Sequence, residues 1–165
     1  MTLLISIIAI IVILSLILIS KKPKKDTKEL TKEYKYQKIH KIVTPAERSF
    51  LGVLDKAVGD KARVLTKVRI ADVIKPEKTE SKSEWYKAFN KISSKHFDYV
   101  LCKNDDLSII CAIELDDSSH NQEKTKKRDL FVNNACKSAK LPLLRVKAKK
   151  DYVMSEIETL IEPYI

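Results

Sequence analysis

The segment FDYVLCKNDDLSIICAIELD, residues 97–116, determines the fold expected for this chain. Two apolar runs, FDYVLC and LSIICAIELD, are joined there by the polar turn KNDD. Apolar runs of this length on either side of a polar turn predict a β-hairpin. Because side chains alternate along a strand, Glu114 and Asp116 share one face, and Asp98 on the partner strand can converge with them.

The length of the hairpin loop sets the alignment of these acids. A five-residue loop, Lys103 to Leu107, places Asp98 opposite Ala112 and diagonal to Glu114 on one face of the hairpin. A four-residue loop would put the two acids on opposite faces unless a β-bulge intervened. A shared site therefore requires the first arrangement or a bulge.

Three carboxylates at the end of an apolar strand are costly to bury unless something compensates their charge. A divalent cation does so, because Mg²⁺ takes oxygen ligands and is often held by one or two carboxylates together with substrate phosphates. Asp98, Glu114 and Asp116 are thus the candidate ligands for Mg²⁺ or Mn²⁺. The chemistry this indicates is metal-assisted cleavage of a phosphodiester.

The segment IELDDSSHNQEKTKKRDLFVNNACKSAKLPLLRV contains an ordered ExDxxxH string, formed by Glu114, Asp116 and His120, followed by Arg128-Asp129 and then LLR. Together with the preceding Asp98, it resembles the PD-(D/E)XK nuclease superfamily near the very-short-patch-repair endonucleases. It is most similar to the bacterial domain-of-unknown-function 2726 family. The resemblance covers residues 43–148.

The resemblance implies an α/β fold with a restriction-endonuclease-like αβββαβ core, in which helices flank a mixed sheet. It also implies a lysine two residues after Glu114, but Asp116 stands there. Lys124 and Lys127, on the next expected helix, are candidates for the missing positive charge. His120 is a third candidate, since its near-neutral pKa suits proton transfer.

Further candidate residues lie outside the hairpin. In related nucleases an acid on the first helix often reaches the metal, which makes Glu47 a candidate, although a capping box with Thr44 explains it equally well. Arg128 and Arg145 are candidates for contacts to nucleic-acid phosphates, and Arg128 could instead pair with a carboxylate of the site. Asp72 matches a recurrent family position without a physical role that we can name.

The expected elements follow from periodicity and capping signals. A helix starts after Thr44, a strand begins at Arg63, a short helix is capped by Ser83, and a longer helix spans 121–140. The strand PLLRVKA and a final helix at 154–161 complete the order. Only two glycines occur, which excludes Gly-rich phosphate loops, and three cysteines without metal-ligand spacing favour reduced, buried thiols.

The N-terminus differs in kind from the rest of the chain. Residues 3–19 are apolar and uncharged, near the lower limit for a membrane span, and KKPKK follows. This order of charges predicts a transmembrane anchor at 1–20 with the remainder in the cytoplasm. A cleaved signal or a buried helix are the alternatives, and the former would make the protein secreted.

The formal net charge of +10 is unevenly distributed. Residues 21–43 contain nine lysines against three acids, a net +6 that suits anionic lipid headgroups, and the rest of the chain carries +4. We expect a basic linker at 21–42 and a nuclease-like domain at 43–165. The expected partner is nucleic acid, DNA more than RNA. The alternative to a nuclease is a non-catalytic nucleic-acid-binding or protein-interaction module on the same fold.

Overall fold

The structure is a computed structural model that describes residues 11, 33–116 and 123–165. Contacts divide the chain into two units, Met1–Lys38 and Ile39–Ile165, and every strand described lies in the second. Nearly all of the expected membrane span lies outside the described residues. Within the described ranges, no helix is long and apolar enough to cross a bilayer.

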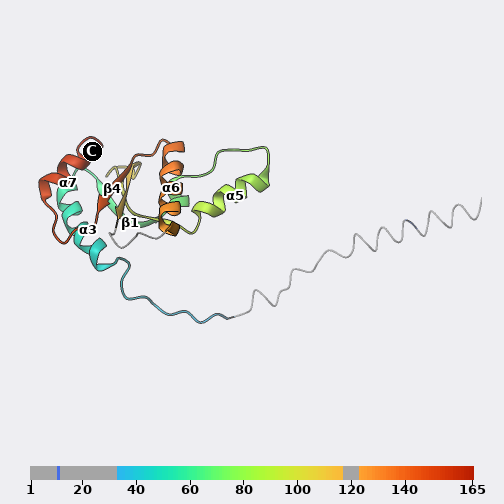
Figure 1. The fold of residues 1–165 in the computed structure, drawn as a ribbon, viewed down its shortest axis with the longest axis horizontal. Coiled ribbons are helices and arrows are strands. Elements are labelled where there is room, and N and C mark those ends of the chain that lie inside the picture. Colours follow the sequence, from blue (N-terminus) through green and yellow to red (C-terminus); the bar gives the residue numbers. More distant parts are fainter. Residues whose placement is uncertain (1–10, 12–32, 117–122) are drawn as a thin grey trace, which may run out of the picture. The chain divides into compact units, whose positions relative to one another are not determined.

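The second unit is a mixed α/β fold (Figure 1). Its strands form one sheet in the order β1-β2-β3-β4, in which β1/β2 and β2/β3 are antiparallel and β3/β4 are parallel. This confirms the predicted mixed sheet flanked by helices. The elements are α3 (Pro45–Val58), β1 (Arg63–Arg69), α4 (Ile70–Val73), α5 (Lys82–Ile92), β2 (His96–Cys102), β3 (Ile109–Asp116), α6 (Glu123–Ser138), β4 (Leu143–Lys147) and α7 (Met154–Ile161).

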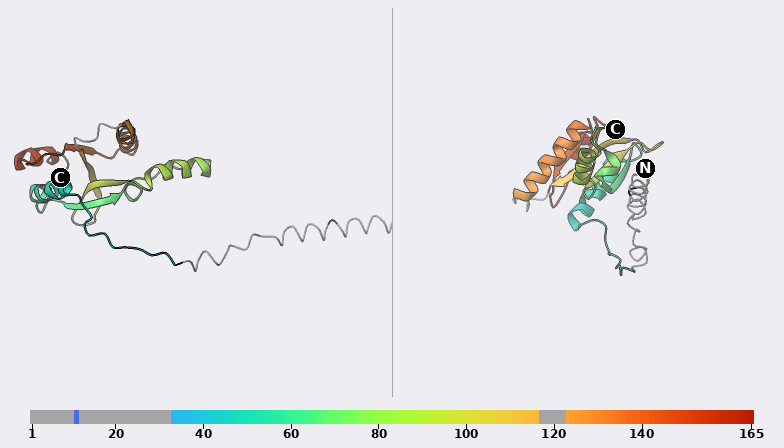
Figure 2. Two further views of the ribbon diagram at one scale, coloured as in Figure 1. Left: turned by 60° about the horizontal axis from the view of Figure 1, so that its bottom comes forward. Right: turned by 90° about the vertical axis from the view of Figure 1, so that its right-hand side faces the viewer.

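Helices cover both faces of the sheet (Figures 1 and 2). Each face carries its own hydrophobic core. On one face, α3 and α7 pack against alternate strand residues such as Tyr99, Leu101 and Ile113. On the other face, α4, α6 and the end of α5 pack against Val100 and Ala112. The alternation of buried residues along β2 and β3 follows from the period of two in a strand and explains their continuous apolar runs.

The predicted hairpin register was wrong by two residues. The structure pairs Val100 with Ala112 and Tyr99 with Ile113, so the continuing register brings Asp98 level with Glu114 and not with Ala112. A register shift between Leu101 and Cys102 accommodates the longer loop. Such a bulge adds a residue to one strand, which is why loop counting alone misjudged the alignment.

The helix starts were predicted in part. Thr44 caps α3, and its reciprocal hydrogen bonds with Glu47 form the predicted capping box. The prediction that Ser83 caps α5 was wrong. Ser81 is the N-cap, because its hydroxyl accepts a hydrogen bond from the backbone N–H of Glu84, which places Ser83 in the first turn.

Candidate functional site

Glu114 is the most deeply buried charged residue described, with 4% of its surface exposed. It lies near the end of β3, and one carboxylate oxygen, Oε2, accepts a hydrogen bond of 3.2 Å from the Arg128 guanidinium of α6. The other oxygen, Oε1, has no hydrogen-bond partner among the described residues. A buried carboxylate oxygen without a donor is rare in folded proteins and requires a specific explanation.

Burial and the negative charge of Asp98 raise the pKa of Glu114, Arg128 and Arg145 partly offset them, and the resulting pKa is about 7. The carboxylate is destabilised because it has left water without full compensation. A positive charge placed beside Oε1 would therefore be bound favourably.

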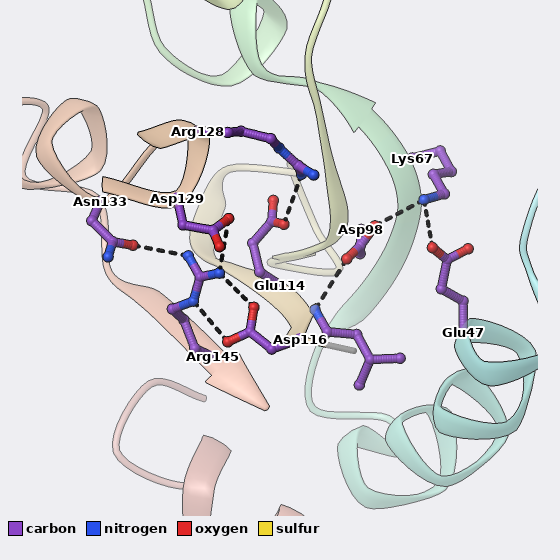
Figure 3. Close-up of polar contacts among 10 residues, drawn as sticks. Glu47, Lys67, Asp98, Glu114, Asp116, Arg128, Asp129, Asn133 and Arg145 are labelled. Carbon is purple, nitrogen blue, oxygen red and sulfur yellow. Dashed lines mark hydrogen bonds and ion pairs between the residues drawn. The ribbon is translucent and has the colours of Figure 1, made fainter. Parts of the chain in front are cut away.

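Asp98 lies beside Glu114 at the same end of the sheet, with 9% of its surface exposed (Figure 3). Its Oδ1 accepts a hydrogen bond of 2.8 Å from the Lys67 ammonium, and its Oδ2 accepts one of 3.0 Å from the backbone N–H of Leu115. Lys67 also donates to Glu47 Oε1 at 2.8 Å. A single lysine thus bridges carboxylates from α3 and β2.

The capping-box reading of Glu47 is confirmed, whereas Glu47 is not among the residues that line the cavity of the site. It completes the capping box of α3 and, through Lys67, is joined to the site. Burial raises the pKa of Glu47, but hydrogen bonds from Lys67 and Thr44 outweigh it and hold the pKa below its ordinary value. Likewise, burial lowers the pKa of Lys67, and its bonds to Asp98 and Glu47 raise it above the usual range.

The backbone at Lys67 departs from regular strand geometry, with a φ of 53°. The flanking pairs of β1 and β2 place Lys67 opposite Asp98. At this point the alternation of β1 breaks, so that Leu65 and Val68, three residues apart, pack in the same core. A non-glycine residue in this conformation costs about 1–3 kcal/mol, and such outliers cluster at functional sites. Sequence reasoning missed Lys67, because no local pattern signals this conformation.

Asp116 lies two residues beyond Glu114 but has a different environment (Figure 3). Arg145 of β4 contacts both of its carboxylate oxygens, with Nε donating to Oδ2 at 2.9 Å and Nη2 to Oδ1. Arg145 also contacts Asp129 and Asn133 of α6. Hydrogen bonding to Asp116 raises the pKa of Arg145 above its ordinary value. The predicted phosphate ligand Arg145 and the predicted metal ligand Asp116 thus satisfy one another.

Several of these side chains line one polar cavity of about 620 Å³. Its acidic lining residues are Asp98, Glu114, Asp116 and Asp129. The basic lining residues are Lys67, Lys95 and Arg128, and His96 stands beside Lys95. The structure therefore brings together Asp98, Glu114, Asp116 and Arg128 as predicted, and adds Lys67, Lys95 and His96, which the sequence analysis did not select.

The remaining predicted site residues fall into two groups. His120 lies outside the described residues, as does the side chain of Lys124. Lys127 does not line the cavity, since its side chain is 76% exposed and pairs with Glu123 one helical turn earlier. Asp72 pairs with Arg69 on the surface.

The donor set of the site limits which metal ion it can hold. Among residues 33–116 and 123–165, no three or more His, Cys, Asp and Glu side chains are grouped closely enough to hold a metal ion. Asp98 and Glu114, with the free Oε1 of Glu114, form a two-carboxylate set. Such a set fits Mg²⁺, which keeps several waters and takes other ligands from the substrate.

Fold and site define this chain as a mixed α/β domain with a cavity of paired acids and cations at one end of its sheet. The chain belongs to the family described as "Protein of unknown function (DUF2726)", which matches residues 39–164. The predicted resemblance to this family is thereby confirmed. Comparisons with curated proteins and with solved structures gave no match.

Proposed function

We propose that this protein is a metal-dependent phosphodiesterase that cleaves nucleic acid. The observation that carries the proposal is the buried carboxylate of Glu114, whose Oε1 has no donor, beside Asp98 in a cavity with a basic rim. An enzyme that acts on phosphodiesters needs both a cation site and positive groups for the phosphate, and this cavity has candidates for each.

Asp98 and Glu114 are the residues that would hold Mg²⁺ or Mn²⁺. A bound ion of this kind polarises a phosphoryl oxygen and lowers the pKa of a coordinated water. Arg128, Lys95 and His96 lie at the cavity wall, where they bind and orient the substrate phosphate through charge-assisted hydrogen bonds. Asp116 positions Arg145 through its bidentate pair and is not free to bind the ion in this arrangement.

Lys67 supplies the positive charge that the superfamily pattern places two residues after Glu114. Its ammonium lies 2.8 Å from Asp98 Oδ1 and lines the cavity. Lys127 is turned to Glu123, so Lys67 is the better supported candidate of the two. The role of Lys67 is to stabilise negative charge that develops on the phosphate during attack by water.

The finer family assignment is part of the same proposal. The observed order, once the inserted helices α4 and α5 and the final helix α7 are set aside, is α3-β1-β2-β3-α6-β4. This order supports a restriction-endonuclease-like core of the PD-(D/E)XK superfamily, near the very-short-patch-repair endonucleases. The order and the positions of Asp98 and Glu114 on adjacent strands support that assignment.

We further propose that residues 3–19 anchor the protein in a membrane, with the domain at 43–165 in the cytoplasm. The support is the apolar run followed by KKPKK and the lysine-rich linker at 21–42. Substituted-cysteine labelling from either side of the membrane tests this topology. Labelling of the domain from the outer side would overturn it.

A non-catalytic binding module is the second candidate. One observation favours it: both oxygens of Asp98 and both oxygens of Asp116 already have donors within the protein. In that case the acids serve structure, and nucleic acid binds only to the basic rim. This candidate predicts salt-sensitive binding without any cleavage.

A cleavage assay separates the two. Labelled single-stranded and double-stranded DNA and RNA are incubated with the purified chain and Mg²⁺ or Mn²⁺, with and without chelator. We expect cleavage that requires the metal and that falls in Lys67→Met as far as in an acid variant, whereas Lys127→Ala retains it. His120→Ala and Lys124→Ala test the other predicted charge carriers. Binding of all four substrates without cleavage would favour the binding module.

A further inference from the structure

A second, apolar cavity of about 480 Å³ lies between α5 and α6. Its apolar lining includes Ala88 and Ile92 of α5 and Phe131, Ala135 and Ala139 on the α6 side. Helix α5 extends away from the sheet (Figures 1 and 2), and Ile92 is its only buried residue. The apolar face of α5 is thus only partly covered, which leaves this α5–α6 groove open.

The α5–α6 groove and the candidate active site share a wall. Lys95 lines the acidic cavity, and its ammonium lies 5.4 Å from the centre of the Phe131 ring, which lines the groove. Lys95 also donates a hydrogen bond of 2.6 Å to the backbone carbonyl of Lys91, a residue of the groove rim. The acidic cavity and the groove are therefore neighbours at Lys95, whose ammonium stands over the Phe131 ring.

The rim of the groove carries a positive balance. Its charged lining residues are three lysines and two glutamates, and Lys95 adds a further cation at the boundary with the candidate active site. These lining residues are Lys75, Lys87, Lys91, Glu77 and Glu84. An apolar floor with an aromatic ring and a basic rim is the arrangement that binds nucleic-acid strands. Bases stack on the ring, and phosphates contact the lysines.

We propose that the α5–α6 groove receives an unpaired nucleobase next to the phosphodiester that lies in the acidic cavity. This inference rests on the proposed function and deepens it by naming the substrate class. A base stacked and paired within a duplex presents no free face to such a groove. The preferred substrate is therefore a single strand, or a duplex with an unpaired base beside the cleavage position.

The test measures binding by the purified chain in chelator, so that no substrate is consumed. Fluorescence anisotropy compares a labelled single strand of about a dozen nucleotides with the duplex of the same sequence. We expect the single strand to bind about tenfold more tightly, since one stacked base contributes about 1–3 kcal/mol. Equal affinity for both forms would overturn the proposal.

Two variants address the groove itself. Ala88→Trp fills it from an exposed position on α5, and Phe131→Ala removes the aromatic ring from its wall. Each should lower single-strand affinity about tenfold and leave Mn²⁺ affinity unchanged. Asn134→Trp, on the exposed side of α6, is the matched control and should bind as the wild type does. Unchanged single-strand affinity in Ala88→Trp, with the fold verified by circular dichroism, would refute the groove.

Other outcomes separate this proposal from the proposed function. If the wild type cuts duplexes and the groove variants have no effect, the groove proposal fails and the nuclease stands. If single strands bind in a groove-dependent way and none is cut with Mn²⁺, the nuclease fails and the groove stands. If Ala88→Trp converts a dimer into a monomer without changing oligonucleotide affinity, the groove is a self-association surface and the proposal is overturned.

Discussion

Glu114 and Asp116 lie two residues apart on one strand, yet their surroundings are opposite in kind. Asp116 is 38% exposed at its side chain, and both of its oxygens accept hydrogen bonds from Arg145. Glu114 is almost fully buried and accepts one hydrogen bond, from Arg128, and its Oε1 has no partner among the described residues. The carboxylate with less access to water is therefore also the one with less compensation.

This difference indicates which of the two carboxylates has an oxygen left to accept a further contact. The Asp116–Arg145 pair ties β3 to β4 and α6, and its charges are satisfied within the protein. The Glu114 carboxylate is held next to Asp98, which raises its pKa together with burial. Uncompensated buried charge weakens a fold, and the proposed cation would supply the missing compensation.

The largest expected effect is on catalysis. Glu114→Gln should lower metal-dependent cleavage about a thousandfold, because a metal-held transition state is stabilised by several kcal/mol and about 1.4 kcal/mol corresponds to each factor of ten. Asp116→Asn should lower it about tenfold or less, because Asp116 acts through Arg145. Steady-state cleavage rates measure both. Equal losses in the two variants would remove the distinction between the two acids.

The next effect concerns stability against pH. The pKa of Glu114 is raised from 4.5 to about 7, so between these values the unfolded chain releases this proton and the folded protein retains it. The free energy of unfolding should therefore fall as pH rises from about 4.5 to 7, by about 3 kcal/mol in all, and level off above that. Urea denaturation of the wild type and of Glu114→Gln measures this contribution.

The control for this pH effect is Asp116→Asn, which should keep the dependence that Glu114→Gln removes. Saturating Mn²⁺ should also reduce the pH-dependent decrease in the free energy of unfolding of the wild type, since the ion takes the place of the proton. An identical dependence of stability on pH in wild type and Glu114→Gln would contradict the raised pKa of Glu114.

A smaller loss of stability is expected on the Asp116 side. Arg145→Met leaves Asp116 and Asp129 without their shared cation and should lower the free energy of unfolding by about 2 kcal/mol. The value is below that for fully buried pairs, because Asp116 is partly exposed. Urea denaturation of Arg145→Met/Asp116→Asn should recover part of the loss. No loss in the single variant would mean that this pair does not hold the strands together.

The smallest effect belongs to Lys127, which sequence reasoning selected as a charge carrier. Its pair with Glu123 is exposed on both sides, and exposed pairs at this helical spacing contribute about 0.3–0.5 kcal/mol. Lys127→Ala should change stability by no more than that and leave cleavage intact. A cleavage defect comparable to that of Lys67→Met would mean that Lys127 on α6 supplies the positive charge of the site.

Sequence reasoning reached the parts of the fold that local patterns specify. The capping box at Thr44, the helix at 154–161 and the apolar runs of β2 and β3 follow from short-range periodicity, and the structure agrees. Placing Asp98 and Glu114 at one end of the sheet followed from the same alternation. The register itself did not, because the bulge after Leu101 has no local signature.

The pairing of Arg128 with a carboxylate of the site was one of the predicted alternatives, and Arg128 contacts Glu114. The partners of Lys67 and Arg145 could not be predicted, for a different reason. Lys67 and Asp98 are separated by 31 residues, and Arg145 and Asp116 by 29, so their contacts depend on the assembled sheet. The positive φ at Lys67 likewise arises from tertiary structure. A lysine or an arginine in a charged sequence is usually solvated, and only the fold selects the few that meet a buried acid.

The central claim is that Glu114 belongs to an open cation site and Asp116 to a closed ion pair, and isothermal titration of Mn²⁺ into the purified chain tests it most directly. We expect Mn²⁺ binding in the wild type, strong weakening in Glu114→Gln and in Asp98→Asn, and an affinity within a few-fold of wild type in Asp116→Asn. Equal affinity in wild type and Glu114→Gln, or a loss confined to Asp116→Asn, would contradict the account.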